Sequence, residues 1–316
     1  MNDFNNSGEL YTIRNQFYTG QHQKVAAYDV QLFSQVVRPK VLELQIRSHV
    51  ALAHDASQLI DDGRTQFADH ATLFDLLQAW NDLHALNTGD STYFEAVNQA
   101  EFEAQACLTA LYWTKVHGNH EQAISILAGF VSSTAASAHD LEPYLLLVQL
   151  HLIHGRFAEA SKVYAQFQKF PVSARDDIVY QVTESWISAA KGGFDNINNA
   201  SCFYDELLAA DFDGDAHGKY HLLSVLFALT VQLKRYPEAQ DLLEQIDQLQ
   251  FKNDAAGDLL ANRMTFEYLT KKGENVVVLL RQLAGVNPNH ALLADLKDKN
   301  AIFDAIVEKY QPANAK

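Results

Sequence analysis

Residues 155–160 read Gly155-Arg156-Phe157-Ala158-Glu159-Ala160, and three further stretches of the chain repeat this order of residue types. They are Gly20-Gln21-His22-Gln23-Lys24-Val25, Gly118-Asn119-His120-Glu121-Gln122-Ala123 and Lys234-Arg235-Tyr236-Pro237-Glu238-Ala239. Each places an aromatic residue or His at the third position and a small apolar residue at the sixth. Glycine permits a tight turn between two helices. The small residue lets two antiparallel helices approach closely, so the order predicts helical hairpins.

The spacing of these stretches supports a repeated hairpin. Gly118 and Gly155 are 37 residues apart, close to the period of about 34 residues of a tetratricopeptide repeat. Apolar residues recur three and four apart, as in 222–229, and alternation with period two is scarce. We therefore predict an all-α, tetratricopeptide-like helical-hairpin solenoid wound as a right-handed superhelix. The predicted turns lie at Gly20, Gly118, Gly155, Gly193, Lys234 and Gly273.

Three segments are expected along the chain. Residues 1–8 are expected to form a flexible N-terminal tail, 9–285 the repeat solenoid, and 286–316 C-terminal capping helices. The stretch 36–86 has helical periodicity without a clear repeat register. We also expect Ala123, Ala160, Ala200 and Ala239 to be buried at the closest helix contacts.

The net charge and the cysteine content argue against several classes of partner and of cellular compartment. The 316 residues hold 24 Lys and Arg against 39 Asp and Glu, a net charge of −15. Such acidity argues against direct contact with nucleic acid or an anionic membrane surface, since both need a basic footprint. Two cysteines, Cys107 and Cys202, do not suggest a disulfide framework, and Cys202 is expected on a helix that packs in the core. Without a leader-like N-terminus or a long apolar run, we expect a soluble protein of a reducing compartment.

Catalytic and metal-binding patterns are scarce. Among 13 histidines, His151 and His154 share a helix, and His117 and His120 flank a turn. A zinc site needs three or four convergent ligands, and no second cluster at ligand spacing accompanies these pairs. Phosphate-loop, dinucleotide-binding and nucleophile-elbow motifs are also absent from the sequence. We expect no enzymatic activity, no cofactor and no metal.

The predicted groove has a definite composition. In a tetratricopeptide array the first helix of each unit lines the concave face, and counting back from the turns identifies its residues. The candidate partner-binding residues are Leu108, Tyr112, Leu145, Gln149, Leu152, Thr183, Ile187 and Val231. A mostly apolar groove is costly to leave in water, which implies a bound partner, whereas capture of an acidic peptide end would need basic residues. The alternative is that these side chains belong to the core.

The sequence resembles one known family, the epsilon subunits of coatomer, the COPI vesicle coat. The resemblance rests on four places in the chain: Glu9-Leu10-Tyr11 with Arg14-Asn15, Phe17-Tyr18 and Gly20; Ser185-Trp186-Ile187-Ser188-Ala189-Ala190-Lys191-Gly192-Gly193 followed by Ala200 and Phe203; Arg235-Tyr236 with Glu238-Ala239 and Leu242-Leu243; and Asn287-Pro288 with Lys297, Phe303-Asp304 and Tyr310. The second, with its Trp and double Gly, is the most specific.

The resemblance implies a non-catalytic coat protein. Such a protein wraps around part of the C-terminal region of the alpha subunit, stabilises it, and shares a subcomplex with the beta-prime subunit. The resemblance further implies a cytoplasmic protein, peripheral on Golgi membranes and COPI-coated vesicles, that supports retrograde transport to the endoplasmic reticulum. Membrane contact would be indirect, through the rest of the coat. A tetratricopeptide co-chaperone or peptide-binding adaptor is the alternative function, and a helical-repeat enzyme is a third.

Overall fold

The computed structural model confirms the all-α class. It describes residues 7–133, 141–209, 212, 215–249 and 256–310, and every regular element in these ranges is a helix. None of the helices described is long and apolar enough to cross a membrane.

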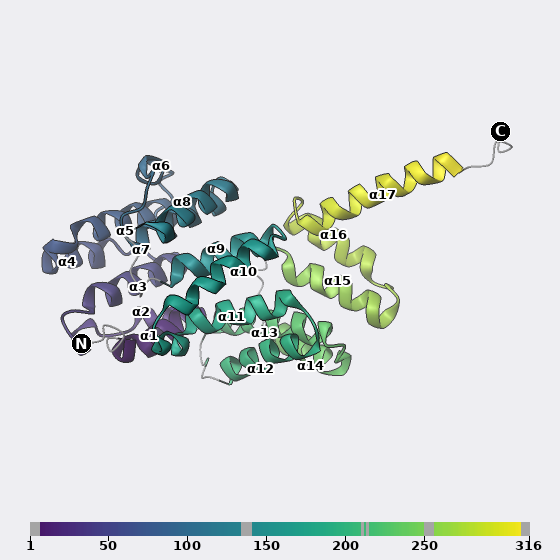
Figure 1. The fold of residues 1–316 in the computed structure, drawn as a ribbon, viewed down its shortest axis with the longest axis horizontal. Coiled ribbons are helices and arrows are strands. Elements are labelled where there is room, and N and C mark those ends of the chain that lie inside the picture. The colour runs from purple at the N-terminus through teal and green to yellow at the C-terminus, as the bar shows by residue number, and fades with distance from the viewer. Residues whose placement is uncertain (1–6, 134–140, 210–211, 213–214, 250–255, 311–316) are drawn as a thin grey trace. The chain divides into compact units, whose positions relative to one another are not determined.

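The chain divides into two compact units, 1–222 and 223–316. Figure 1 labels the helices in chain order. The division falls inside a helix, α13, that runs from Ala216 to Gln232. Residues 1–6 of the expected tail and 311–316 of the expected cap lie outside the described residues, and Ser7 and Gly8 already belong to the first helix. The domain bounds expected from the sequence stay a prediction.

Most helices follow one another as pairs joined by short turns. The pairs are α1 (Ser7–Tyr18) with α2 (His22–Ala26), α3 (Arg38–Ala51) with α4 (Ser57–Gln66), α5 (Ala71–His84) with α6 (Thr92–Ala96), α7 (Glu103–Lys115) with α8 (His120–Ser132), α9 (Glu142–Ile153) with α10 (Phe157–Ala165), α11 (Ile178–Lys191) with α12 (Phe194–Leu208), α13 with α14 (Tyr236–Gln248), and α15 (Asp258–Lys271) with α16 (Val276–Val286). The last helix is α17 (Ala291–Tyr310). All six predicted turns separate the helices of a pair, as expected.

The turns at Gly155 and Lys234 share one geometry, although only one of them has glycine. Gly155 has a φ of 67°, and Lys234 reaches 59° at the equivalent place. After α9 the amide of Arg156 donates to the carbonyl of His151 at 2.8 Å, and after α13 the amide of Arg235 donates to the carbonyl of Thr230 at 3.2 Å. These bonds satisfy helix-end carbonyls and fix where the second helix starts. The substitution of Lys for Gly therefore leaves the hairpin intact.

The alanines that follow the turns are buried, as predicted. Ala123, Ala160, Ala200 and Ala239 are at most 2% exposed. Each lies in the first turns of a second helix, where a larger side chain would separate it from its partner. The repeat register assigned from the sequence is therefore correct in these four hairpins.

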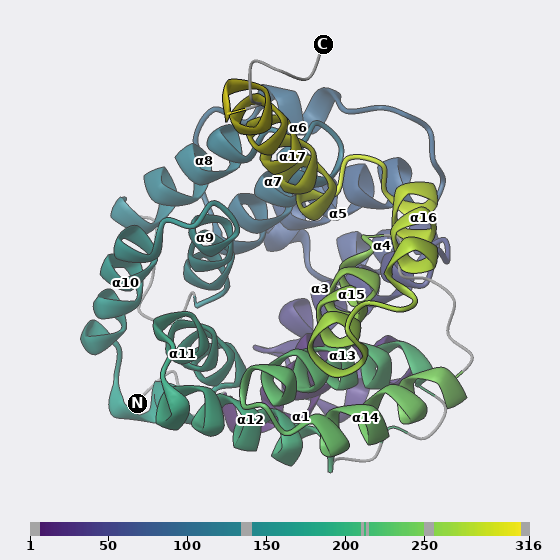
Figure 2. The ribbon, with the colours of Figure 1, turned by 90° about the vertical axis from the view of Figure 1, so that its right-hand side faces the viewer.

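The first unit contains a closed circuit of helices. The first helices of successive pairs, α1, α3, α5, α7, α9 and α11, contact one another in chain order, and α11 also contacts α1. Figure 2 shows α10 and α12 peripheral to α9 and α11. The first helix of the chain thus completes the circuit that the sixth hairpin would otherwise leave open.

Apolar clusters among the described residues stabilise this unit, and three of them join its first helices. One joins α1, α2 and α3 through residues such as Ile13, Val25 and Leu44. The second joins α3, α5 and α7, and includes Phe74 and Leu108. The third joins α7 through α11 and has 21 buried residues, which makes it larger than either of the others. Cys107 is buried, and Cys202 is exposed on α12, a helix that buries Ala200, Ser201 and Tyr204; both thiols are free.

One apolar cluster of the second unit joins α15, α16 and the start of α17. Ala261 and Met264 of α15 pack with Val276 and Leu283 of α16, and leucines 292, 293 and 296 at the start of α17 lie against them. No residue of α17 is buried. The helix is therefore anchored by its first half, and residues beyond 297 extend past the apolar cluster.

Candidate partner-binding surfaces

Most of the eight predicted groove residues are buried within the chain itself. Leu108, Tyr112, Leu145, Thr183, Ile187 and Val231 are at most 9% exposed. Gln149 is exposed and Leu152 is half-buried, and both lie on α9. In the conformation described, the core alternative therefore applies to six of the eight side chains.

The cover over Tyr112 explains its burial. The ring of Phe94 on the short helix α6 stacks on Tyr112 with centroids 5.1 Å apart, and the Tyr112 hydroxyl lies 2.9 Å from Glu95 Oε1. Leu108 packs in the same cluster with α3 and α5. Helices α3 and α5 lie within residues 36–86, the stretch in which the sequence showed no clear repeat register, and α6 follows it. The predicted groove is filled there by the chain's own residues.

The accessible groove positions lie toward the C-terminal ends of the first helices. Lys115 at the end of α7 is exposed, as is Gln149 in the last turn and a half of α9, next to the half-buried Leu152. By the same repeat register, Ala190 near the end of α11 is exposed. This end of the three helices offers a partner a mixed polar and apolar surface that includes the cationic side chains of Lys115 and Lys191.

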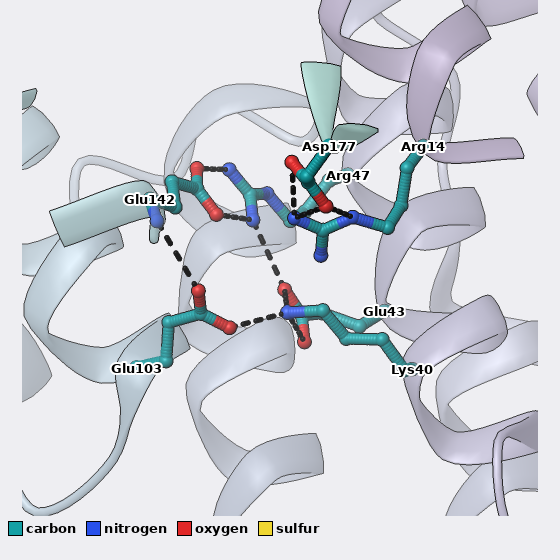
Figure 3. A network of polar contacts seen from close by, with 7 residues as sticks. All are labelled: Arg14, Lys40, Glu43, Arg47, Glu103, Glu142 and Asp177. Atoms are coloured by element: carbon teal, nitrogen blue, oxygen red, sulfur yellow. Dashed lines mark hydrogen bonds and ion pairs between the residues drawn. The ribbon is translucent and has the colours of Figure 1, made fainter. Parts of the chain in front are cut away.

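A buried network of charges occupies the opposite ends of these helices (Figure 3). Glu103 and Glu142 are the first residues of α7 and α9, and Asp177 is the N-cap of α11. A carboxylate is favoured at a helix N-terminus, where unpaired amides and the helix dipole attract negative charge. Each of the three acids also pairs with a basic side chain from α1 or α3. The network therefore joins the start of the chain to three successive repeats.

The pairs have close geometry. Lys40 Nζ lies 2.8 Å from Glu103 Oε2. Arg47 forms two hydrogen bonds with the Glu142 carboxylate and one of 3.0 Å with Glu43 Oε1. Figure 3 shows these side chains converging from both sides of the unit.

The third pair joins α1 to α11. Arg14 Nε donates to Asp177 Oδ2 at 3.0 Å, and its Nη2 donates to Oδ1 at 3.2 Å. The Asp177 carboxylate also accepts a 2.8 Å hydrogen bond from the amide of Val179. This second bond caps α11 without help from α1.

Burial and pairing act in opposite directions on the charges of the network. Burial alone lowers the pKa of Arg47, but the charges of Glu142 and Glu43 outweigh it and raise that pKa well above its usual value. Burial alone raises the pKa of Glu142, but Arg47 and then Lys40 hold it below its usual value. These groups therefore remain charged at neutral pH, and the network is a set of ion pairs.

Pattern analysis of the sequence did not reveal this network. Arg47 and Glu142 are 95 residues apart, and Arg14 and Asp177 are 163 residues apart. The only local signal was an acid in the first turn of α7 and α9, which many solvent-exposed helices also carry.

Four of the 13 histidines form two close pairs. His120 Nδ1 and His154 Nε2 are 2.9 Å apart, between α8 and the end of α9. His217 and His221 on α13 bring their Nε2 atoms to 3.3 Å. Among the residues that the structure describes, no group of three or more His, Cys, Asp or Glu is placed to hold a metal ion.

An apolar face is exposed on the second half of α17. Its side chains are 40–73% exposed and recur three and four residues apart, and they are Ile302, Phe303, Ile306, Val307 and Tyr310. Such spacing places them along one side of the helix. We name this set the α17 apolar face. Exposed apolar stripes of this kind mark binding surfaces more often than isolated apolar residues do.

The chain is similar in sequence to proteins of the COPI coat. A family model described as "Coatomer epsilon subunit" matches residues 6–311. The "Probable coatomer subunit epsilon" of Schizosaccharomyces pombe is 26% identical over 210 residues, which are 65% of this chain and 64% of that protein. The chain thus matches less than two thirds of the relative's length.

One solved structure shares the fold. The crystal structure of the APC/C hetero-tetramer Cut9-Hcn1 superposes with a TM-score of 0.56 at 17% sequence identity, covering 95% of this chain and 57% of that one. At this identity the likeness concerns only the helical-hairpin solenoid.

Proposed function

Because the chain belongs to the coatomer epsilon-subunit family, we propose that it is a non-catalytic structural subunit of the COPI coat that binds and stabilises the C-terminal region of the alpha subunit. The α17 apolar face is the single observation that carries this proposal. Five large apolar side chains remain in water on a chain with a net charge of −15. Covering them with a partner removes apolar surface from water, which favours a stable and salt-insensitive association.

A second contact is proposed on the accessible end of the groove. Gln149 and Leu152 are the predicted partner-binding residues that reach the surface. Lys115 lies at the equivalent end of the neighbouring helix, α7. An extended or hairpin segment of the alpha subunit would lie against these side chains, while the α17 apolar face would contact a folded part of the same region.

The proposed setting follows from the family. The protein would share a subcomplex with the alpha and beta-prime subunits, and would work in the cytoplasm, peripheral on Golgi membranes and COPI-coated vesicles, in retrograde transport to the endoplasmic reticulum. Its contact with the membrane would be indirect, which fits its acidic charge.

Co-purification with the alpha subunit tests the proposal. Phe303→Asp with Ile306→Asp places two carboxylates in the α17 apolar face and is expected to abolish co-purification, because desolvated carboxylates without partners oppose the contact. The matched control replaces Asp304 and Glu308 by Ala on the same exposed helix and is expected to keep the alpha subunit bound. Helix content by circular dichroism should equal that of the parent in both variants. Retention of the alpha subunit by the folded Asp variant would remove this face from the interface.

A high-salt wash separates the proposed function from the co-chaperone alternative. Protein isolated from its own cells and washed at high salt should retain large coat subunits in equal amount. Sub-stoichiometric chaperones in place of coat subunits would favour the adaptor. The variant Tyr112→Asp with Ile187→Asp is expected to lose helicity together with binding, because both side chains are buried in the chain.

A further inference from the structure

A cavity of about 370 Å³ is lined by side chains of α11 and α12, the two helices of one hairpin. Ala200 and Ser185 form its base, since they are only 2% and 6% exposed, whereas Glu184 and Asn199 are exposed and lie at its mouth. The volume is at the lower end of the range of about 300–1,000 Å³ that is typical of ligand pockets. We call this space the α11–α12 cavity, and it has room for one long side chain or a ligand of similar size.

Most of the side chains that line the cavity are polar. They are Gln181, Glu184, Ser185 and Ser188 of α11 and Asn199 of α12. Ligand pockets are usually lined by apolar side chains, with a few polar groups that orient the ligand. A lining with this many polar side chains favours a ligand that itself forms several hydrogen bonds.

The polar groups of this lining are largely available to a ligand. The Tyr164 hydroxyl donates to Glu184 Oε1 at 2.8 Å, which orients the carboxylate and leaves Oε2 to accept a further hydrogen bond. Among the residues that the structure describes, Glu184 forms no ion pair, and the side chains of Gln181, Ser188 and Asn199 form no hydrogen bond. A bound ligand would therefore not have to displace existing partners of these groups.

The charge of the lining selects a cation. Glu184 is the one charged residue that lines the cavity, and no Lys, Arg or His lines it. A positively charged donor would form a charge-assisted hydrogen bond with the Glu184 carboxylate. The side-chain carbonyls of Gln181 and Asn199 and the Ser188 hydroxyl can accept further hydrogen bonds from the same group. An anionic ligand would find no opposite charge here.

Among the cationic groups of proteins, a guanidinium matches this lining better than an ammonium. It presents five N–H donors in a planar fork, whereas an ammonium is a compact, strongly hydrated point charge with three. The remaining lining residues, Ala200 and Phe203, are apolar, and the methylene stem of an arginine can pack against them. Free arginine also carries a carboxylate, for which the lining offers no cation. The chemistry therefore favours an arginine side chain that belongs to a polypeptide.

We propose that the α11–α12 cavity binds the guanidinium group of an arginine side chain on a partner protein. None of the lining residues belongs to the α17 apolar face or to the eight predicted partner-binding residues. This inference therefore does not rest on the proposed function, and its test does not use the alpha subunit.

Titration of the full chain with Nα-acetyl-arginine amide tests the site, with the NMR signals of Ser188 and Asn199 as the readout. This probe presents the side chain as a peptide does, without charged termini. A dissociation constant on the order of 1 mM is expected for a ligand of this size. Nα-acetyl-citrulline amide has nearly the same shape but no charge, and at matched ionic strength it should bind at least about tenfold more weakly. Equal affinities, or unchanged signals from the lining residues, would overturn the inference.

A pair of matched variants assigns the binding to Glu184. Glu184→Gln removes the charge but can still accept the hydrogen bond from Tyr164, and it is expected to weaken binding of Nα-acetyl-arginine amide at least about tenfold. Glu206→Gln makes the same change of net charge at an exposed position of α12 outside the lining, and it should leave the affinity unchanged. Circular dichroism should give the parent spectrum for both. Parent-like affinity in a folded Glu184→Gln variant would contradict the proposal, and the citrulline comparison, made on the parent alone, does not depend on how either variant folds.

Two further probes identify the chemical group and its source. Nα-acetyl-lysine amide should bind more weakly than the arginine probe, because an ammonium has fewer donors and is more strongly hydrated. Free arginine should also bind more weakly, because its carboxylate finds no cation in the lining. Tighter binding of the lysine probe would overturn the assignment to a guanidinium. Tighter binding of free arginine would assign the cavity to a small molecule and overturn the assignment to a protein side chain.

Discussion

Gly20 and Gly218 lie in backbone contact although 198 positions separate them in the sequence. A Cβ built on Gly218 would lie 2.6 Å from the carbonyl oxygen of Thr19 and 3.1 Å from the carbonyl carbon of Gly20. The turn after α1 therefore packs against the start of α13, and both belong to the first unit. Gly218 has no room for a side chain, whereas Gly20 has a φ of 78° and its Cβ would lie 3.2 Å from the Cα of Gly218.

The first prediction concerns this contact. Gly218→Ala is expected to lower the free energy of unfolding by about 1–3 kcal/mol, because the methyl group meets rigid backbone. Gly129→Ala on α8 is the control: nothing lies within 4 Å of its Cβ position. It should raise stability by about 0.5–1 kcal/mol through helix propensity. Chemical denaturation of both variants measures the difference, and similar shifts for the two would contradict the contact.

The second prediction concerns the hairpin register. Ala160→Leu should overpack the α9–α10 hairpin and cost about 1–3 kcal/mol, because Ala160 is fully buried. Ala158→Leu, two residues earlier on the exposed side of α10, should change stability by no more than about 0.5 kcal/mol. Melting temperatures measured by circular dichroism distinguish the two. An unchanged melting temperature for Ala160→Leu would show that the site has room.

The sequence predicted the structural features that depend on residues close together in the chain. The turn at Gly155 and the buried Ala160 follow from six adjacent residues, and the structure confirms both. The exposed α17 face could be read from helical periodicity at Phe303 and Tyr310. The cover over Tyr112 could not, because Phe94 belongs to a five-residue helix with no repeat pattern.

The buried charge network could not be predicted from the sequence. Arg47 contacts Glu142 only because the chain closes on itself 95 residues later. The spacing of residues along one helix does not reveal which other helix packs against it. The predicted groove residues show the same limit. Counting along the repeats assigned their positions, but it could not reveal that other parts of the chain bury them.

The third prediction concerns that network. Arg47→Met leaves the buried carboxylate of Glu142 without its main partner, removes one of the two partners of Glu43, and should cost about 3–5 kcal/mol. Adding Glu142→Leu removes one of the stranded charges and should recover part of the loss, so the two substitutions are expected to couple by at least about 1 kcal/mol. A double-mutant cycle on the exposed pair Arg64 and Asp75 should give only about 0–1 kcal/mol. Equal coupling in the two cycles would mean that burial does not strengthen the Arg47 pair.

The fourth prediction concerns acid sensitivity at His22. Its ring packs edge-on to Phe17 at 5.5 Å and bonds the Ser48 hydroxyl at 3.2 Å. Burial, followed by the charges of His217, Arg47, His221 and Lys115, lowers the pKa of His22 from 6.5 to about 4. Between these values the unfolded chain binds a proton that the folded chain does not. The stability associated with neutral His22 is therefore complete above pH 6.5 and is lost as the pH falls toward 4.

His22→Gln keeps a polar contact for Ser48 but cannot take up the proton. We expect the melting temperature of the parent to fall more between pH 7.5 and pH 5 than that of His22→Gln, measured by calorimetry at constant ionic strength. His70→Gln, on an exposed turn, serves as the control and should follow the parent. His217 also has a pKa lowered by burial, although Asp215 raises it in part, so some acid sensitivity should remain in the His22 variant. Identical pH dependence in the parent and in His22→Gln would show that this buried ring does not set the acid response.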